Sequence, residues 1–253
     1  MKMLHRARGQ IQELAVTREG DVVTLWFEGK VRQTVFDRTA PHLPGLEYAR
    51  CMLASLVFCP RADSCLMLGL GGGSIPRMML AARPQMRVEA VEIDPDVVEV
   101  ASRYFEIGAL PRFTIHLEDA AAFLGRRTSR YGIVLLDTYI GETFPDRCLS
   151  GECFRDIRES LQEEGVLAIN WLTGDARLEE TLLKNLESAF DQVWMLPCRE
   201  SHNVLYFAST RATTHSALLS AAAAAEAELP FDGSLKRLAL SLRSRQPAVG
   251  GRQ

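Results

Sequence analysis

The chain of 253 residues lacks the features that mark several classes of protein. It has no apolar run long enough to span a bilayer. Its formal net charge of −3 offers no excess of positive charge to nucleic acid or an anionic membrane. The six cysteines form no CxxC pair, and Cys148 and Cys153 have no histidine nearby. We therefore expect a cytoplasmic protein with reduced thiols, no metal, and neither nucleic acid nor membrane as a partner.

The first 45 residues have a composition typical of β-structure. Three β-rich runs, Ile11–Val16, Val22–Phe27 and Val31–Phe36, are separated by turn signals that contain glycine. Such a small meander is not stable alone in water. We expect it to form an N-terminal region that packs on the main domain or on a partner subunit.

Residues 46–232 alternate between apolar runs and helical patterns. The predicted strands are Cys65–Leu68, Arg87–Ile93, Phe113–Leu117, Gly132–Leu136, Val166–Trp171, Val193–Leu196 and Val204–Ala208. This alternation predicts an α/β fold with a mostly parallel, doubly wound, Rossmann-like sheet of seven strands. The short connection between the last two strands predicts a hairpin, so the final strand is antiparallel. Residues 233–253 are expected to form an amphipathic segment and a disordered tail, Gln246–Gln253.

A glycine loop follows the first of these strands. Gly69, Gly71, Gly72 and Gly73 come directly after the apolar run that ends at Leu68, and a helix start follows at Ser74. Glycines let the backbone turn tightly and approach a ligand closely, and a helix N-terminus offers free N–H groups. The loop therefore predicts the nucleotide-binding corner of an α/β sheet.

Carboxylates lie at or just after the ends of the next three strands, and the carboxyl ends of parallel strands meet at one edge of a sheet. Glu92 can accept hydrogen bonds from a ribose diol, which argues against a 2′-phosphate; the alternative is an exposed strand end. Asp119 can accept from an adenine amine while the Ala120 N–H serves a ring nitrogen, or it can cap the next helix. Asp137 can hold or deprotonate an amine nucleophile, or it can fix a loop. Together they predict an adenosyl site.

These residues carry a resemblance to a known family. The chain resembles the spermidine/spermine synthases (polyamine aminopropyltransferases), especially a divergent bacterial branch, over residues 46–208. The matching positions are Tyr48, the glycine loop, Glu92-Ile93-Asp94, Glu118-Asp119, Asp137 and the run Leu149–Phe154. The resemblance implies an S-adenosyl cofactor, a small-molecule substrate such as a polyamine, and a homodimer built through the N-terminal β region. It assigns Glu92 to the ribose, Asp119 to adenine and Asp137 to the reacting amine, and Tyr48 and Tyr139 to the substrate pocket, with helix packing as the alternative for Tyr48.

The chain departs from the family at two acidic positions. Gly72 stands where the family has an aspartate in the glycine loop, and Ile140 stands where it has a second aspartate in the fourth loop. Buried cations need carboxylate partners, so both changes bear on amine recognition. We expect Glu142 to replace part of this charge and to act with Asp137 in catalysis.

Three interpretations stay open. The first is aminopropyl transfer from decarboxylated S-adenosylmethionine to a diamine, with methylthioadenosine as the product. The second is methyl transfer from S-adenosylmethionine, with S-adenosylhomocysteine as the product, because Gly72 removes a negative charge from where a cofactor carboxylate would lie. The third is a non-catalytic nucleoside-binding or assembly protein.

Overall fold

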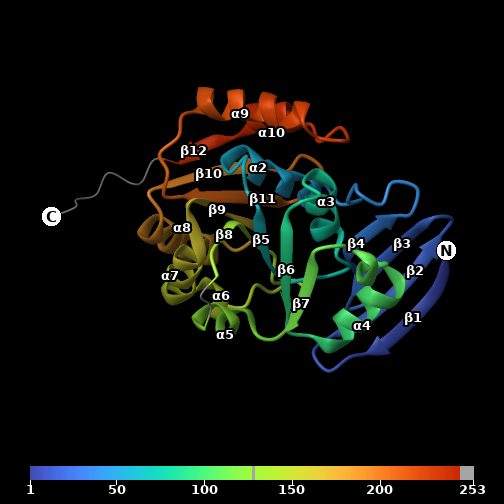
Figure 1. The fold of residues 1–253 in the computed structure, drawn as a ribbon. Coiled ribbons are helices and arrows are strands. Elements are labelled where there is room, and N and C mark those ends of the chain that lie inside the picture. The colour runs from blue at the N-terminus through green and yellow to red at the C-terminus, as the bar shows by residue number, and fades with distance from the viewer. Residues whose placement is uncertain (127–128, 246–253) are drawn as a thin grey trace.

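The computed structural model describes residues 1–126 and 129–245 and contains two sheets (Figure 1). The smaller is antiparallel, with strands in the order β1 (Lys2–Arg8), β2 (Glu13–Glu19), β3 (Val22–Phe27) and β4 (Val31–Asp37). The predicted meander corresponds to β2–β4, although β2 begins two residues after Ile11. The edge strand β1 was not predicted, because its sequence KMLHRAR is mostly polar and exposed and has no alternating apolar face.

The larger sheet has the strand order β12-β10-β11-β9-β8-β5-β6-β7. Its strands are β5 (Ser64–Leu68), β6 (Arg87–Glu92), β7 (Phe113–Leu117), β8 (Tyr131–Leu136), β9 (Leu161–Leu172), β10 (Gln192–Pro197), β11 (Asn203–Ser209) and β12 (Arg243–Arg245). Strands β5 to β9 are parallel, and β11 runs antiparallel between β9 and β10. The predicted doubly wound sheet with a terminal hairpin is thus confirmed, and the three-residue β12 adds an eighth strand at the edge.

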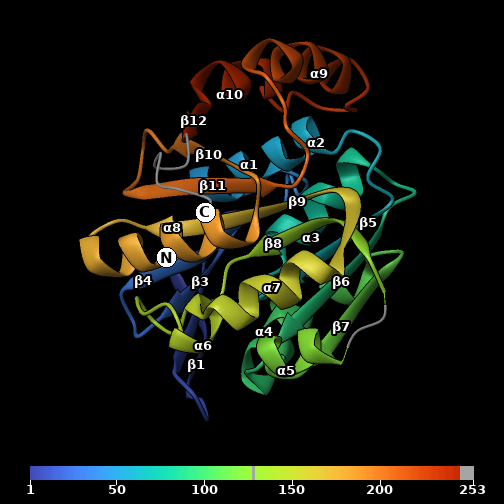
Figure 2. The ribbon, with the colours of Figure 1, turned by 90° about the vertical axis from the view of Figure 1, so that its left-hand side faces the viewer.

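Helices cover both faces of this sheet. They are α1 (Glu47–Cys51), η1 (Met52–Ala54), α2 (Ser55–Phe58), α3 (Ser74–Ala82), α4 (Pro95–Tyr104), η2 (Ile107–Ala109), α5 (Ala120–Gly125), α6 (Asp146–Leu149), α7 (Gly151–Ser160), α8 (Ala176–Ala189), α9 (His215–Ala227) and α10 (Leu235–Ser241). Alternate strand residues enter two separate cores: Met67 packs with α2 and α3, whereas Leu66 and Leu68 pack with α5 and α7. Figure 2 shows α9 and α10 on one side of the sheet and α7 and α8 on the other.

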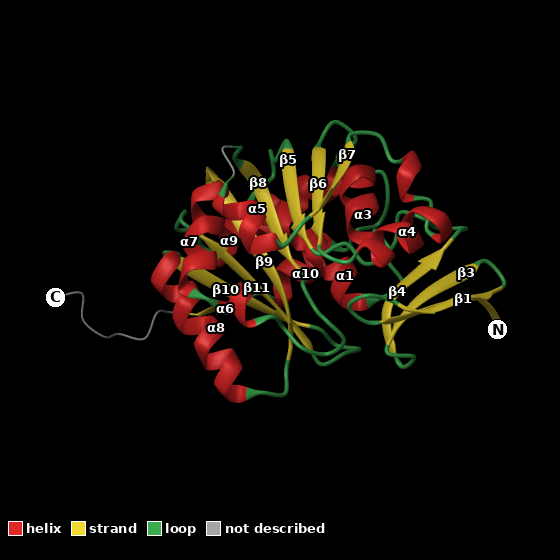
Figure 3. Ribbon diagram, turned by 90° about the horizontal axis from the view of Figure 1, so that it is seen from below, coloured by secondary structure: helices red, strands yellow, loops and turns green. Residues whose placement is uncertain are grey.

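The small sheet packs beside the main sheet, next to α3 and α4 (Figure 3). Its buried residues Leu14, Leu25 and Phe36 belong to the same apolar cluster as the residues under α3 and α4. The two sheets therefore share a core, and this packing places β4 beside the glycine loop. The division into residues 1–45, 46–232 and 233–253 stays a prediction. The tail Gln246–Gln253 lies outside the described residues.

Candidate active site

A cavity of about 250 Å³ opens at the carboxyl ends of β5, β6, β7 and β8. Seven of the residues that the sequence assigned to cofactor, substrate or catalysis line it: Gly69, Gly71, Glu92, Asp119, Ala120, Asp137 and Tyr139. They come together because parallel strands deliver their terminal loops to one edge of the sheet. Gly72, Gly73, Tyr48 and Glu142 are not part of the lining.

The glycine loop turns sharply at the end of β5. Gly69 has a φ of +95°, and a Cβ at this position would lie 2.2 Å from the carbonyl oxygen of Asp137. Its amide donates to the carbonyl of Val91 at 2.8 Å. Only glycine allows both this φ and this approach. The loop therefore lies close to the ends of β6 and β8, where Glu92 and Asp137 are found.

Two backbone hydrogen bonds hold the carboxylate of Glu92 beside the glycine loop. One of its oxygens accepts from the amide of Leu70 at 3.0 Å, and the other accepts from the amide of Asp94 at 2.9 Å. Burial raises the pKa of Glu92, and these backbone hydrogen bonds oppose the shift. A carboxylate has about four lone-pair sites, so each oxygen keeps capacity for a ligand hydroxyl. Asp94 itself caps α4 and accepts a hydrogen bond from the amide of Asp96 at 2.9 Å.

Asp119 lines the cavity and caps a helix at the same time. One oxygen accepts from the amide of Ala122 at 2.9 Å, at the N-terminus of α5. The other lies 3.5 Å from Nη1 of Arg147, whose side chain also borders the cavity. Asp119 therefore does cap α5, which was the alternative role for this residue. It uses only one of the two oxygens, so it does not exclude a contact between Asp119 and a ligand.

Asp137 is the buried acid of the site, with 8% of its surface exposed. Nδ2 of Asn170 donates to it at 2.8 Å, and the Tyr48 hydroxyl is also hydrogen-bonded to it. Desolvation raises the pKa of Asp137 to about 6, although both hydrogen bonds act to lower it. Sequence patterns did not single out Asn170, because it lies inside an otherwise apolar strand, β9. Asn170 is fixed in turn by Asn203 in β11, whose Nδ2 donates to the side-chain amide oxygen of Asn170 at 2.8 Å.

The two tyrosines lie on different sides of Asp137. Tyr139 lines the cavity; its hydroxyl accepts from the amide of Leu172 at 2.7 Å, and its ring packs edge-on against Phe144. Tyr48 lies behind Asp137, beside a space of about 10 Å³ that Ser74 also borders. The buried hydroxyl of Ser74 has no hydrogen-bond partner among the described residues. Tyr48 therefore does not line the main cavity and is connected to it only by its hydrogen bond with Asp137.

The structure gives a physical reason for the missing acid at Gly72. A Cβ at this position would lie 2.7 Å from Cγ2 of Thr34 and 3.0 Å from Cδ1 of Phe105. Strand β4 therefore fills the space beside the loop, and Gln33 from the same strand lines the cavity.

The loop that follows β8 brings no acid besides Asp137 to the cavity. Ile140 borders the cavity and remains 41% exposed. The structure leaves Glu142 on the exposed part of the same loop and does not bring it to Asp137. Two glutamines, Gln12 and Gln33, also line the cavity. Gln12 lies in the connection between β1 and β2, and its side-chain oxygen accepts a hydrogen bond from the amide of Gly141 at 3.1 Å. No motif marks Gln12 or Gln33, because both reach the cavity through the packing of the small sheet.

The described residues contain neither a metal-ligand cluster nor a membrane-spanning helix. In the ranges 1–126 and 129–245, no three His, Cys, Asp or Glu side chains are grouped so that they could hold a metal ion. In the same ranges, no helix has the length and apolarity needed to cross a membrane.

The comparison with known families decides the relationship. The model of the spermine/spermidine synthase domain matches residues 49–208, which include the glycine loop and every carboxylate of the cavity. The chain belongs to the spermine/spermidine synthase family. The resemblance based on the sequence motifs is thereby confirmed.

The relatives of this spermine/spermidine synthase family member include two kinds of transferase. It is 29% identical to polyamine aminopropyltransferases of Vibrio vulnificus, over 66% of this chain and 58% of that protein, and of Neisseria meningitidis serogroup B, over 82% and 80%. It is 31% identical to the eEF1A lysine and N-terminal methyltransferase homolog of Drosophila melanogaster, over 61% of this chain and 25% of that protein. The chain thus spans less than two thirds of the length of some of the curated relatives it matches.

Solved structures of other proteins show the same fold. A probable spermidine synthase from Corynebacterium glutamicum has a TM-score of 0.75 at 18% identity, and the match covers 98% of both chains. Human methyltransferase-like protein 13, in complex with SAH, has a TM-score of 0.67 at 24% identity, over 73% of this chain and 92% of that one. The first match includes the small N-terminal sheet as well as the large one.

Proposed function

We propose that this protein is an S-adenosyl-dependent transferase that alkylates an amine nitrogen. Aminopropyl transfer from decarboxylated S-adenosylmethionine to a diamine is the first candidate, because polyamine aminopropyltransferases match the largest share of the chain. The observation that carries the proposal is Asp137, a buried acid whose pKa is raised to about 6 beside an open cavity. Such a group is ionised at neutral pH and basic enough to accept a proton from a bound ammonium.

The cavity fits an adenosyl group. Gly69 and Gly71 line the cavity with backbone alone, and each oxygen of Glu92 keeps accepting capacity for a ribose hydroxyl. The second oxygen of Asp119 and the backbone of Ala120 lie at the cavity wall, where they would bind the edge of adenine. The bound donor would supply a carbon activated by its sulfonium.

Asp137 would prepare the acceptor for attack on that carbon. It takes a proton from the bound ammonium and so frees the nitrogen lone pair; the new C–N bond then forms as the C–S bond breaks, and sulfur keeps the electron pair. Asn170 and Tyr48 hold the carboxylate in place during this step. Tyr139 borders the same space and would position the acceptor. Glu142 is left out of this assignment because it does not line the cavity.

Methyl transfer from S-adenosylmethionine is the second candidate. It is favoured by the packing of Thr34 against Gly72, which leaves no room for an acid beside the donor's amine tail. Ile140 is uncharged as well, so neither of these two positions supplies a carboxylate for the two cations of aminopropyl transfer. A donor that keeps its own carboxylate needs less negative charge from the protein. Relatives named as methyltransferases are consistent with this candidate.

The experiment uses the full chain in two steps. Calorimetry measures the binding of methylthioadenosine and S-adenosylhomocysteine, and turnover is then measured with each donor and a series of amines. Binding of either product supports the adenosyl site, and the donor that turns over selects the candidate. No binding of either at millimolar concentration contradicts both. Binding without turnover by any donor would leave a nucleoside-binding protein. The homodimer through the small sheet stays a prediction that sedimentation tests.

A further inference from the structure

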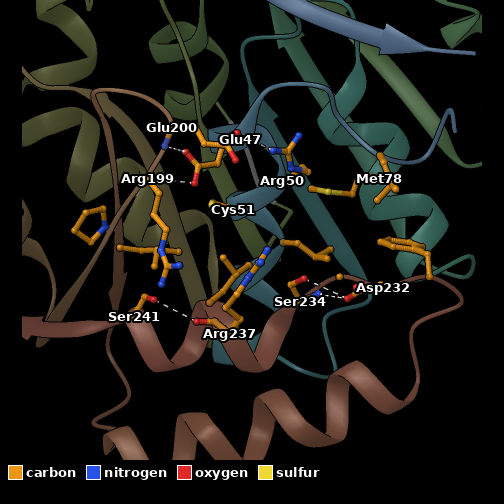
Figure 4. Close-up of a pocket in the computed structure, with 17 residues that line it drawn as sticks. Glu47, Arg50, Cys51, Met78, Arg199, Glu200, Asp232, Ser234, Arg237 and Ser241 are labelled. Atoms are coloured by element: carbon orange, nitrogen blue, oxygen red, sulfur yellow. Dashed lines mark hydrogen bonds and ion pairs between the residues drawn. The ribbon is translucent and has the colours of Figure 1, made fainter.

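A second cavity lies on another side of the molecule and shares no lining residue with the first. Its volume is about 220 Å³. It is enclosed by α1, the β10–β11 connection, and α10 with the loop before it (Figure 4). None of the residues assigned above to the transferase reaction borders it. The proposed function therefore does not explain this cavity.

Two arginines face this cavity without a partner. Figure 4 shows Arg199 extending from the β10–β11 connection toward α10, and Arg237 extending from α10 into the space. Neither guanidinium has a hydrogen bond or ion pair with another described residue. A third arginine, Arg50, donates to the carbonyls of Pro44 and Gly45 at 2.9 and 3.1 Å. Arg199 and Arg237 thus retain all of their N–H donors for a ligand.

The three acids around the cavity already have partners: Glu200 pairs with Arg50 at 3.5 Å, and Glu47 and Asp232 hold the walls. Glu47 accepts from the amides of Arg199 and Glu200, at 2.9 and 2.6 Å, and so fixes the β10–β11 connection on α1. Asp232 accepts from the amide of Ser234 at 2.9 Å, in the turn that leads into α10. The carboxylates therefore give the cavity its shape, whereas the two free guanidiniums give it unused hydrogen-bonding capacity.

The floor of the cavity is apolar. Leu53, Met78 and Leu196 are each about 1% exposed and close it from below, and Phe231 and Leu238 border it from the side of α10. A fully hydrated ion would leave this surface unused. A ligand with an apolar body would cover it and gain about 0.8 kcal/mol for each buried methylene.

We propose that this cavity binds a small organic anion. Its oxyanion lies between Arg199 and Arg237, which arrive from different elements, and its apolar part lies on Leu53, Met78 and Leu196. Carboxylates and phosphate monoesters share this chemistry, because guanidinium forks bind both. The two guanidiniums that face the space favour an anion over a cation.

Titration calorimetry of the full chain tests the site. The probes are hexanoate, hexyl phosphate, inorganic phosphate and hexylammonium, each at up to millimolar concentration. We expect both hexyl anions to bind, inorganic phosphate to bind more weakly, and hexylammonium not to bind. Across acetate, butyrate and hexanoate, affinity should rise up to about four-fold for each methylene that reaches the floor. The stronger of the two hexyl anions identifies the oxyanion that the arginines prefer.

Four variants locate the binding. Arg199→Gln and Arg237→Gln should each weaken the hexyl anions at least about ten-fold, as expected for hydrogen bonds to charged groups. Both side chains are exposed, and unfolding curves confirm that the variants fold. Arg61→Gln, an exposed arginine outside both cavities, and Arg147→Gln, in the first cavity, should bind as the wild type does. The proposal is overturned if no anion binds, if hexylammonium binds equally well, or if Arg199→Gln and Arg237→Gln have no effect.

Discussion

The hydroxyl oxygen of Thr34 accepts a hydrogen bond from the amide of Gly72 at 2.9 Å, and this bond fastens the small sheet to the glycine loop of the large one. The methyl group of the same threonine occupies the space that a side chain at position 72 would need. The absence of an acid from the loop and the position of β4 are therefore parts of one packing arrangement.

Restoring the family's acid should be destabilising. Gly72→Asp would overpack a site closed by Thr34 and Phe105, and we expect the free energy of unfolding to fall by about 1–3 kcal/mol. Urea denaturation measures this. Gly108→Asp is the control, because a Cβ at Gly108 meets nothing within 4 Å. Adding Thr34→Ala should recover part of the loss at position 72. Equal losses at positions 72 and 108 would contradict the steric account.

Asp137 should lower stability at neutral pH. Burial raises its pKa from the ordinary value of 3.8 to about 6, so the folded protein binds an extra proton between these values. The contribution of Asp137 to the free energy of unfolding therefore falls as pH rises through this window, by about 3 kcal/mol at about 1.4 kcal/mol per pKa unit. Asp137→Asn should thus stabilise the protein above the upper value and have little effect below the lower one. Denaturation curves at both pH extremes measure this, and a pH-independent difference would contradict it.

The same group should control the pH profile of the proposed reaction. If Asp137 accepts the amine proton, kcat/KM at fixed donor concentration falls as pH drops through about 6, because the carboxylate becomes protonated. Asp137→Asn should lose this limb together with nearly all activity, while still binding the adenosyl product. A wild-type profile that is flat across this region would show that another group takes the proton.

Glu92 should control binding of the adenosyl group. Glu92→Gln removes a charged acceptor, and we expect methylthioadenosine or S-adenosylhomocysteine to bind at least about ten-fold more weakly by calorimetry. Part of this loss passes through the loop, because Glu92 also holds the amide of Leu70. Glu99→Gln, at an exposed position of α4, is the matched control and should leave affinity unchanged. Unchanged affinity in Glu92→Gln would remove Glu92 from the site.

Cys148 should report on the occupancy of the cavity. Its thiol lines the cavity, and hydrogen bonding with Cys153 lowers its pKa, whereas burial raises the pKa of Cys65. Iodoacetamide reacts with thiolates, so we expect Cys148 to be alkylated before Cys65 at neutral pH, as read by peptide mass mapping. A bound adenosyl product should slow labelling of Cys148 alone. Equal protection of Cys198, which lies outside the cavity, would indicate a global effect instead.

The large sheet and its edge of acids were predictable from local patterns. The run Cys65–Leu68 is apolar and is followed by glycine, and Glu92, Asp119 and Asp137 each lie at or just after the end of a strand, so the topology alone brings them together. The polar strands β1 and β12 were not predictable, because their pairing partners, not their own sequences, define them as strands.

The rest of the site depends on packing between distant segments. Gln12 and Thr34 reach the large sheet only through the way the small sheet packs on it, and periodicity within either segment does not describe this. Asn170 looks like one polar residue in an apolar strand until the fold places it against Asp137. Likewise, Arg199 and Arg237 come together only when α10 packs beside the β10–β11 connection.

If the glycine loop binds the donor as proposed, the bond between Thr34 and Gly72 places part of the donor site under the control of a structural unit outside the nucleotide-binding core. Substitutions in β4 would then change the space beside the glycine loop, whereas the residues proposed to contact ribose and adenine would stay as they are. Donor preference and nucleoside affinity would thereby become separately heritable traits.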